Sequence, residues 1–239
     1  MLRTLQIYWS AHFGCAPEQL FASPFGLLEH GGELVGYHGA FGLFRNGAAT
    51  VSIPGSFADE LRPRLASLVG GCSPEGLAFA LQSAAKLTIG PAWIGYATEI
   101  APPFQPVRLL NAGDQDALER LQRACDPLEW EHGGSSLEQP CAGVFADGQL
   151  ISLAGFEVWG GAIAHISVVT HPAYRNRGAG RSAVAALARR AIDAGLLPQY
   201  RTLQANAASI RVAETLGFCV YATSMAVRFR APELASPER

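Results

Sequence analysis

Lysine is almost absent from this chain of 239 residues: Lys86 is the only one, and the other 17 of the 18 basic residues are arginines. Charged residues of all kinds make up 16% of the sequence, against about 25% in an ordinary globular domain. The formal net charge is −2 at pH 7, which excludes a general affinity for nucleic acid or for an anionic membrane. Because 49% of the residues are hydrophobic, we expect a folded chain with a large core.

Long apolar runs are missing as well. A membrane-spanning helix needs about 20 consecutive apolar residues, whereas the longest charge-free stretches, such as 158–174, contain Gly-Gly, two histidines and a proline. The N-terminus lacks the basic-then-apolar layout of a signal peptide. The five cysteines are odd in number, widely spaced and form no C-x-x-C pair, so they predict neither a disulfide framework nor a zinc site. We therefore expect a cytoplasmic protein without a bound metal.

The clearest break in the sequence is the segment 100–106, which reads Ile-Ala-Pro-Pro-Phe-Gln-Pro. Three prolines in five residues exclude a helix and disfavour a central strand, so this segment is expected to be an extended connector. It divides the chain into an N-terminal α+β domain, 1–103, and a second domain, 104–239.

The hydrophobic pattern and the turn residues predict the elements of each part. Before the connector we expect helices over 2–13, 57–69 and 74–85, a hairpin over 39–53 with Asn46-Gly47 as its turn, and a strand over 88–98. After it we expect strands over 107–110, 141–145, 149–159, 162–170, 199–204 and 219–229. The helices there are expected over 114–125, 178–194 and 207–216. Strands that alternate with helices around an antiparallel hairpin indicate a mixed α/β sheet.

The most informative segment follows the strand that ends at Thr170. Pro172 stops strand pairing, and the sequence Arg175-x-x-Gly178-x-Gly180 leads directly into a helix. Such a turn directs several free backbone N–H groups, together with the positive end of the helix dipole, at one spot. This is an anion-binding turn, and glycines allow a phosphate to approach its backbone. Glycine-rich strand-to-helix turns also exist for packing alone, so the turn by itself leaves both interpretations open.

A second segment lies one helix and one strand further along: Asn206-Ala-Ala-Ser-Ile-Arg-Val-Ala-Glu-Thr-Leu-Gly-Phe218. By itself it predicts a helix with Asn206 as its N-cap and Gly217 as its stop. The two segments, in this order and at this spacing, closely resemble the GNAT superfamily of acyl-CoA-dependent N-acyltransferases. The resemblance covers about 107–229. Neither the Rossmann fingerprint nor the Walker phosphate loop fits, since Arg-Ser follows Gly180 and the sole lysine lies elsewhere.

The resemblance implies a mixed, mostly antiparallel sheet flanked by helices, with acetyl-CoA as cosubstrate and no metal. The strand before the turn would bind the pantetheine arm through its backbone, with the Val168 N–H as an oxyanion donor. The turn would surround the pyrophosphate. The implied cofactor-binding residues are Val168, Val169, Thr170, Arg175, Asn176, Arg177, Gly178, Ala179, Gly180, Arg181, Ser182, Asn206 and Ser209.

The family often protonates the departing thiolate with a tyrosine on the helix after Asn206, and the matching residue here is Ala213. Either another group such as Ser209, the nearest hydroxyl, replaces that acid, or the thiolate leaves without help.

The family also frequently places a glutamate where this chain has Ala164. His165 beside it is the first candidate for a general base, and Glu157 on the neighbouring strand is the second. A histidine packed on a sheet and a solvated edge carboxylate are the corresponding structural interpretations.

The cluster Glu129, Trp130, Glu131 and His132 follows the first helix of the resembling region, on the side where the family's acceptor enters. Two carboxylates and an indole can bind a cationic amine, although a solvated acidic loop would have the same composition.

The sequence thus predicts an acetyl-CoA-dependent N-acetyltransferase in which an amine attacks the thioester directly. We expect the acceptor to be a small molecule or a protein amine, with the N-terminal domain covering its pocket. The chain is expected to be a monomer or homodimer, without nucleic-acid or membrane partners. The alternative is a non-catalytic acyl-CoA-binding module of the same fold.

Overall fold

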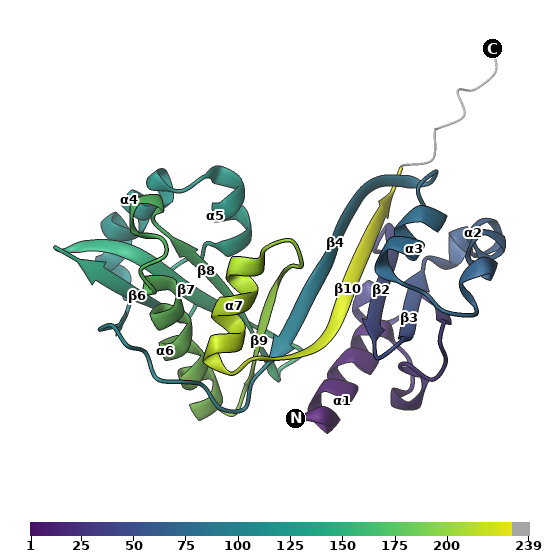
Figure 1. The fold of residues 1–239 in the computed structure, drawn as a ribbon, viewed down its shortest axis with the longest axis horizontal. Coiled ribbons are helices and arrows are strands. Elements are labelled where there is room, and N and C mark those ends of the chain that lie inside the picture. The colour runs from purple at the N-terminus through teal and green to yellow at the C-terminus, as the bar shows by residue number, and fades with distance from the viewer. Residues whose placement is uncertain (231–239) are drawn as a thin grey trace, which may run out of the picture. The chain divides into compact units, whose positions relative to one another are not determined.

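The computed structural model describes residues 1–230, and the chain divides into two compact units (Figure 1). One unit consists of residues 94–221, and the other combines residues 2–93 with 222–230. The expected division at 103/104 therefore falls inside the first unit, and the end of the last strand belongs with the N-terminal residues. The connector at 100–106 contains no helix or strand, as expected from its prolines.

Five strands lie wholly within the unit 94–221: β5 (Arg108–Leu109), β6 (Cys141–Ala146), β7 (Gln149–Trp159), β8 (Ile163–Thr170) and β9 (Leu197–Leu203). They lie in the order β9-β8-β7-β6-β5. The pairs β5–β6, β6–β7 and β7–β8 are antiparallel, whereas β8 and β9 are parallel. The predicted mixed, mostly antiparallel sheet is confirmed.

Helices cover both faces of this sheet. The helices are α4 (Gln115–Ala124), α5 (Pro127–Gly133), α6 (Ala179–Asp193) and α7 (Ala207–Leu216), with 3₁₀ turns η5 (Ala112–Asp114) and η6 (Pro172–Tyr174). Helix α4 packs Leu118 and Leu121 in one cluster with Leu153 and Val169. The neighbouring residues Ser152 and Val168 face Gly180 of α6 instead. Because successive strand residues face opposite sides, α4 and α6 lie on opposite faces.

The other unit begins with α1 (Leu2–Phe13) and contains the strands β1 (Gly26–Glu29), β2 (Gly39–Arg45) and β3 (Ala48–Ile53). Its remaining helices are α2 (Ala58–Leu65), α3 (Pro74–Ala80) and the 3₁₀ turns η1 (Pro17–Gln19), η2 (Gly32–Leu34), η3 (Gly55–Phe57) and η4 (Ala66–Leu68). Strands β4 (Ala85–Tyr96) and β10 (Cys219–Phe229) run through both units. The order here is β1-β3-β2-β10-β4.

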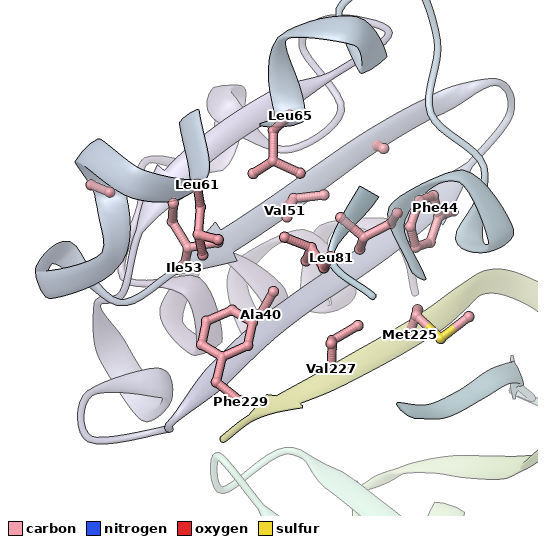
Figure 2. Packing of buried hydrophobic residues seen from close by; sticks show 13 residues of the cluster. Ala40, Phe44, Val51, Ile53, Leu61, Leu65, Leu81, Met225, Val227 and Phe229 are labelled. Carbon is pink, nitrogen blue, oxygen red and sulfur yellow. The ribbon is translucent and has the colours of Figure 1, made fainter. Parts of the chain in front are cut away.

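The core of this unit depends on the last strand of the chain (Figure 2). Met225, Val227 and Phe229 of β10 pack with Leu61 and Leu65 of α2. The backbone of β10 pairs with β2 from Thr223–Phe44 to Arg228–Gly39. Residues almost two hundred positions apart in the sequence therefore build one hydrophobic core.

Most predicted elements are present, and the exceptions have local causes. The predicted helix over 57–69 is interrupted, as η3, α2 and η4 follow one another in it. The predicted loop around Glu129 is helix α5, for which the Asp126 side chain accepts hydrogen bonds from the N–H groups of Leu128 and Glu129. Strand β1 was not predicted. It has four residues and pairs with β3 in parallel, a partnership that short-range patterns do not indicate.

No helix among the described residues is long and apolar enough to cross a bilayer.

Candidate functional site

The two parallel strands at the centre of the unit 94–221 separate before either of them ends. Pairing between β8 and β9 covers only four residue pairs, from Ile163–Leu197 to Ile166–Tyr200. Strand β8 continues to Thr170 and stays paired with β7 on its other side. An opening therefore begins between β8 and β9 just after Ile166.

Backbone polar groups of β8 face this opening. The His171 N–H donates to the Ile151 carbonyl of β7, and alternate residues of a strand direct their N–H and C=O groups to opposite sides. The N–H and C=O of Val168 and Thr170 consequently point away from β7. Gly133 at the end of α5 lies so close that a Cβ there would be 2.5 Å from the Val168 oxygen. The Val168 N–H, which the sequence predicts as the oxyanion donor, thus points away from β7.

The turn between β8 and α6 has an anion-binding backbone conformation. Asn176 and Gly178 both have positive φ, 61° and 78°, and Gly178 is the N-cap of the 15-residue helix α6. The first N–H groups of a helix have no partner within it, and the helix dipole favours an anion there. Arg175 and Arg177 are exposed at this turn. The residues Arg175 to Arg181, named the anion-binding loop for the role that the sequence predicts, are thus brought together at the start of α6.

Close packing also explains why both loop positions, 178 and 180, are glycines. A Cβ on Gly178 would lie 2.2 Å from the ring of Phe104 in the connector, and one on Gly180 would lie 2.9 Å from Thr170 Oγ1. The connector is held to the loop by Gln105, whose side chain donates to the Arg177 carbonyl at 2.6 Å. The buried Ser182 hydroxyl accepts from the Gln105 N–H at 3.3 Å. Ser182 therefore faces the connector.

The acceptor candidates on α5 do not share one environment. Glu129 forms an ion pair with Arg175 at 2.5 Å, so it contacts the anion-binding loop. Trp130 packs against the cluster between α4 and the sheet. Glu131 and His132 are exposed.

His165 lies one residue before the opening, directly opposite Gln199. Its ring stacks on Trp159 with centroids 3.8 Å apart and planes inclined by 11°. Its Nδ1 is 2.8 Å from Gln199 Oε1. Burial, reinforced by the positive charge of Arg201, lowers the pKa of His165 to about 4. The imidazole is therefore neutral at physiological pH.

Glu157 is paired across the strands with His165, but its carboxylate already has two donors. Gln139 Nε2 donates at 2.8 Å and Trp159 Nε1 at 3.2 Å. These hydrogen bonds, with a smaller contribution from His165, lower the pKa of Glu157. A carboxylate stabilised in this way is a weaker base than a free one.

Two hydroxyl groups, one on α7 and one on β9, form a pair on the face of β9 opposite to the Gln199 side chain. Ser209 Oγ lies 2.9 Å from Tyr200 Oη, and the Ser209 N–H donates to the Asn206 side chain at 3.1 Å. Burial raises the pKa of Tyr200. Ala213 is fully buried. Ser209 and Tyr200 are thus the hydroxyls next to the point where β8 and β9 separate.

Sequence reasoning missed Gln199, Tyr200 and the connector residues Phe104 and Gln105. A glutamine in the apolar strand Leu197-Pro-Gln-Tyr200 was the available signal, since a buried amide needs partners.

Two other kinds of site come into question, a groove along α6 and a metal centre. A groove of about 720 Å³ lies along the second half of α6, lined by Arg108, Arg189 and Arg190 among others; it contains none of the residues above. Within residues 1–230, no three His, Cys, Asp or Glu side chains are arranged to hold a metal.

In this fold a pair of parallel strands separates at one end and is followed by a glycine-containing turn at the N-terminus of a long helix. Residues 107–218 match the model of the acetyltransferase (GNAT) family, and this part of the chain belongs to the GNAT superfamily of acyltransferases.

Solved structures share the fold. A GNAT-family acetyltransferase from Colwellia psychrerythraea superposes with a TM-score of 0.53 over 96% of both chains, at 12% identity. A structure assigned to the GNAT family from Novosphingobium aromaticivorans DSM 12444 gives a TM-score of 0.51 at 24% identity, covering 62% of this chain and 67% of that one. No protein of curated function matches the sequence.

Proposed function

We propose that this protein transfers the acetyl group of acetyl-CoA to a primary amine of a small molecule. The observation that carries the proposal is the separation of β8 from β9 after the Ile166–Tyr200 pair. It leaves the Val168 backbone free to bind a thioester arm, one turn away from the anion-binding loop that would bind the pyrophosphate. The family membership of residues 107–218 supports the same cosubstrate.

The reaction joins the amine nitrogen to the acetyl carbon and breaks the carbon–sulfur bond. The carbonyl oxygen gains charge during the attack, and a backbone N–H such as that of Val168 stabilises it. The nitrogen becomes strongly acidic as its bond to carbon forms. Neutral His165, which lies one residue before the opening, accepts that proton. The thiolate takes up a proton from water or through the Ser209–Tyr200 hydroxyl pair.

The pKa of His165 determines which proton it can remove. A base with a pKa of about 4 does not deprotonate a free alkylammonium group, for which the lysine reference pKa is about 10.4. The acceptor therefore enters as the neutral amine, and His165 acts after the attack has begun.

The test is turnover with acetyl-CoA and a panel of small primary amines, followed by thiol release and by mass spectrometry of the products. An amine whose mass increases by one acetyl group in a protein-dependent manner supports the proposal. Binding of CoA without any acetylated product from small amines or from lysine-containing peptides would contradict it.

The second candidate is a non-catalytic acyl-CoA-binding module. Two observations favour it: the buried Ala213 at the position of the family's tyrosine, and the low basicity of His165. This candidate requires CoA binding by calorimetry together with no turnover, so the same pair of measurements separates the two.

A further inference from the structure

We propose that Gln199 is a positioning residue, oriented by Tyr96, that holds His165 in the tautomer protonated on Nδ1 and so leaves its Nε2 unprotonated. The inference rests on the proposed function for its consequence in catalysis. The tautomer itself is a property of the free protein and can be measured without any substrate.

The argument begins with Tyr96 and Gln199, which are both buried; Gln199 has no exposed surface and Tyr96 has 1%. The Gln199 Nε2 amide donates to Tyr96 Oη at 2.5 Å. A side-chain amide has its two donors on nitrogen and its acceptor on oxygen. The amide nitrogen of Gln199 is directed at Tyr96, and its oxygen is directed at His165.

The second step is the contact between Gln199 Oε1 and His165 Nδ1, at 2.8 Å. An amide oxygen only accepts hydrogen bonds, so Nδ1 must carry the proton. In a neutral imidazole the other nitrogen is then an acceptor. Nε2 has no hydrogen-bond partner among residues 1–230, which leaves its lone pair for an incoming N–H group.

The third step concerns the faces of the ring and the charges around it. Trp159 covers one face of the imidazole, and backbone pairing with Glu157 and Gln199 fixes the strand beneath it. Glu157 and Arg201 are the charged groups that act on His165, with opposite effects on its pKa. Gln199 is uncharged, so it orients the ring without stabilising the imidazolium as a carboxylate would. A glutamate in its place would stabilise the imidazolium and raise the pKa of His165.

The first measurement is the tautomer of His165 in the wild-type protein. Two-bond ¹H–¹⁵N correlation spectra distinguish Nδ1–H from Nε2–H imidazoles, and the signals of His165 are assigned from their loss in His165→Gln. We expect a protonated Nδ1 and an unprotonated Nε2 at pH 7. An Nε2–H tautomer in the wild-type protein would overturn the proposal.

The second measurement uses Gln199→Glu, with Gln149→Glu as the matched control. Gln149 lies at the start of β7, paired with Ala146 of β6, so the control adds the same charge to the sheet without touching His165. An adjacent carboxylate typically shifts a pKa by about 1 to 3 units. In Gln199→Glu we expect the pKa of His165 to rise by at least one unit, which is a tenfold higher proton affinity. In Gln149→Glu we expect it to stay unchanged. An unchanged titration of His165 in both variants would contradict the contact.

The third variant, Tyr96→Phe, keeps the buried ring and removes the group that orients the amide. The amide then loses its preferred orientation, and the NMR spectrum should show both tautomers of His165. In turnover, Gln199→Glu should acquire an acidic limb at the raised His165 pKa with the KM for acetyl-CoA unchanged. Absence of all turnover in the wild type would refute the proposed function but leave the tautomer result standing, whereas an unaltered tautomer in Tyr96→Phe would refute the positioning role alone.

Discussion

Arg175 and Glu129 form an ion pair whose nearest atoms, Nη2 and Oε2, are 2.5 Å apart. The sequence assigns Arg175 to the cofactor and Glu129 to the acceptor, yet the two side chains neutralise each other between the anion-binding loop and α5. Both are exposed to nearly half of their side-chain surface, 42% and 47%, so the pair is weak.

Glu129→Gln should therefore tighten the binding of CoA. Removal of the carboxylate frees Arg175 for a phosphate, and we expect about a two- to fivefold lower Kd, in keeping with the energy of an exposed ion pair. Calorimetry on the wild type, Glu129→Gln, Arg175→Gln and the double variant forms a complete cycle. Equal effects of Glu129→Gln with and without Arg175 would show that the pair does not act on the anion site.

Gly178→Ala should raise the Kd for CoA, whereas the loss of folding stability should be no larger than at a glycine outside the loop. The substitution forces an L residue to remain at positive φ and pushes a Cβ into Phe104, which shifts the loop. Gly195→Ala is the matched control, because Gly195 has almost the same φ, 77°, with nothing within 4 Å of its Cβ. Each should lose about 1 to 2 kcal/mol of stability for the left-handed conformation, measured by urea unfolding. A similar CoA Kd for the two variants would remove the loop from the cofactor site.

His165→Ala should lower kcat at neutral pH by about 10²- to 10⁴-fold, the usual contribution of a general base, with the affinity for CoA nearly unchanged. The wild-type profile should have no limb near pH 6.5, because the pKa of His165 is about 4 and the imidazole is already neutral there. The rate should instead rise with pH as the acceptor amine loses its proton. A wild-type limb near pH 6.5 that disappears in His165→Ala would contradict the low pKa.

Met225→Ala should lower the free energy of unfolding by about 2 to 5 kcal/mol, the usual range for a buried methionine. Met225 is 2% exposed and packs in the core that joins β10 to α2 and α3. Val220→Ala on the same strand is the control, since Val220 is 63% exposed and should change stability by less than about 0.5 kcal/mol. Comparable losses in the two variants, by urea unfolding, would show that this core is not as described.

Asp114→Asn should destabilise the protein at neutral pH and lose that effect in acid. Arg108 donates to both Asp114 oxygens and the Asn111 N–H to one of them, which lowers the Asp114 pKa from 3.8 to about 2. A lowered folded pKa adds stability above the unfolded pKa and loses it as the pH falls through the folded value. The gap in urea midpoint between wild type and variant should thus be full above pH 5 and close towards pH 2. The exposed Asp116→Asn serves as control, and a gap that persists at pH 2 would exclude the carboxylate as its origin.

The sequence was sufficient to predict features whose determinants are local. Helix α6 follows from apolar residues such as Val184, Leu187 and Ala191 on one face, and the β2–β3 hairpin follows from Asn46-Gly47. The anion-binding turn was recognisable because Pro172, Gly178 and the following helix are contiguous in sequence. Helix α5 was missed because it has seven residues and few apolar ones.

Features that depend on two distant segments were not predictable in this way. The contact of His165 with Gln199 spans 34 positions and requires the parallel register of β8 and β9, which no local pattern contains. The packing of Gly178 against Phe104 likewise needs the path of the connector. Strand alternation alone does not tell which face of the sheet the His165 side chain occupies. Its contacts with Trp159 and Gln199 establish its environment.

The assignment of β10 to both units affects the order in which the protein can fold on the ribosome. Residues 94–221 are an uninterrupted stretch of the chain, so every residue of that unit is synthesised before residue 222. The N-terminal residues emerge earlier, yet their core lacks Met225, Val227 and Phe229 until the final strand is made. Although domains usually fold in the order of synthesis, here the inserted unit is complete first. The nascent N-terminal segment must keep its unfilled apolar surface from aggregating until β10 has been synthesised.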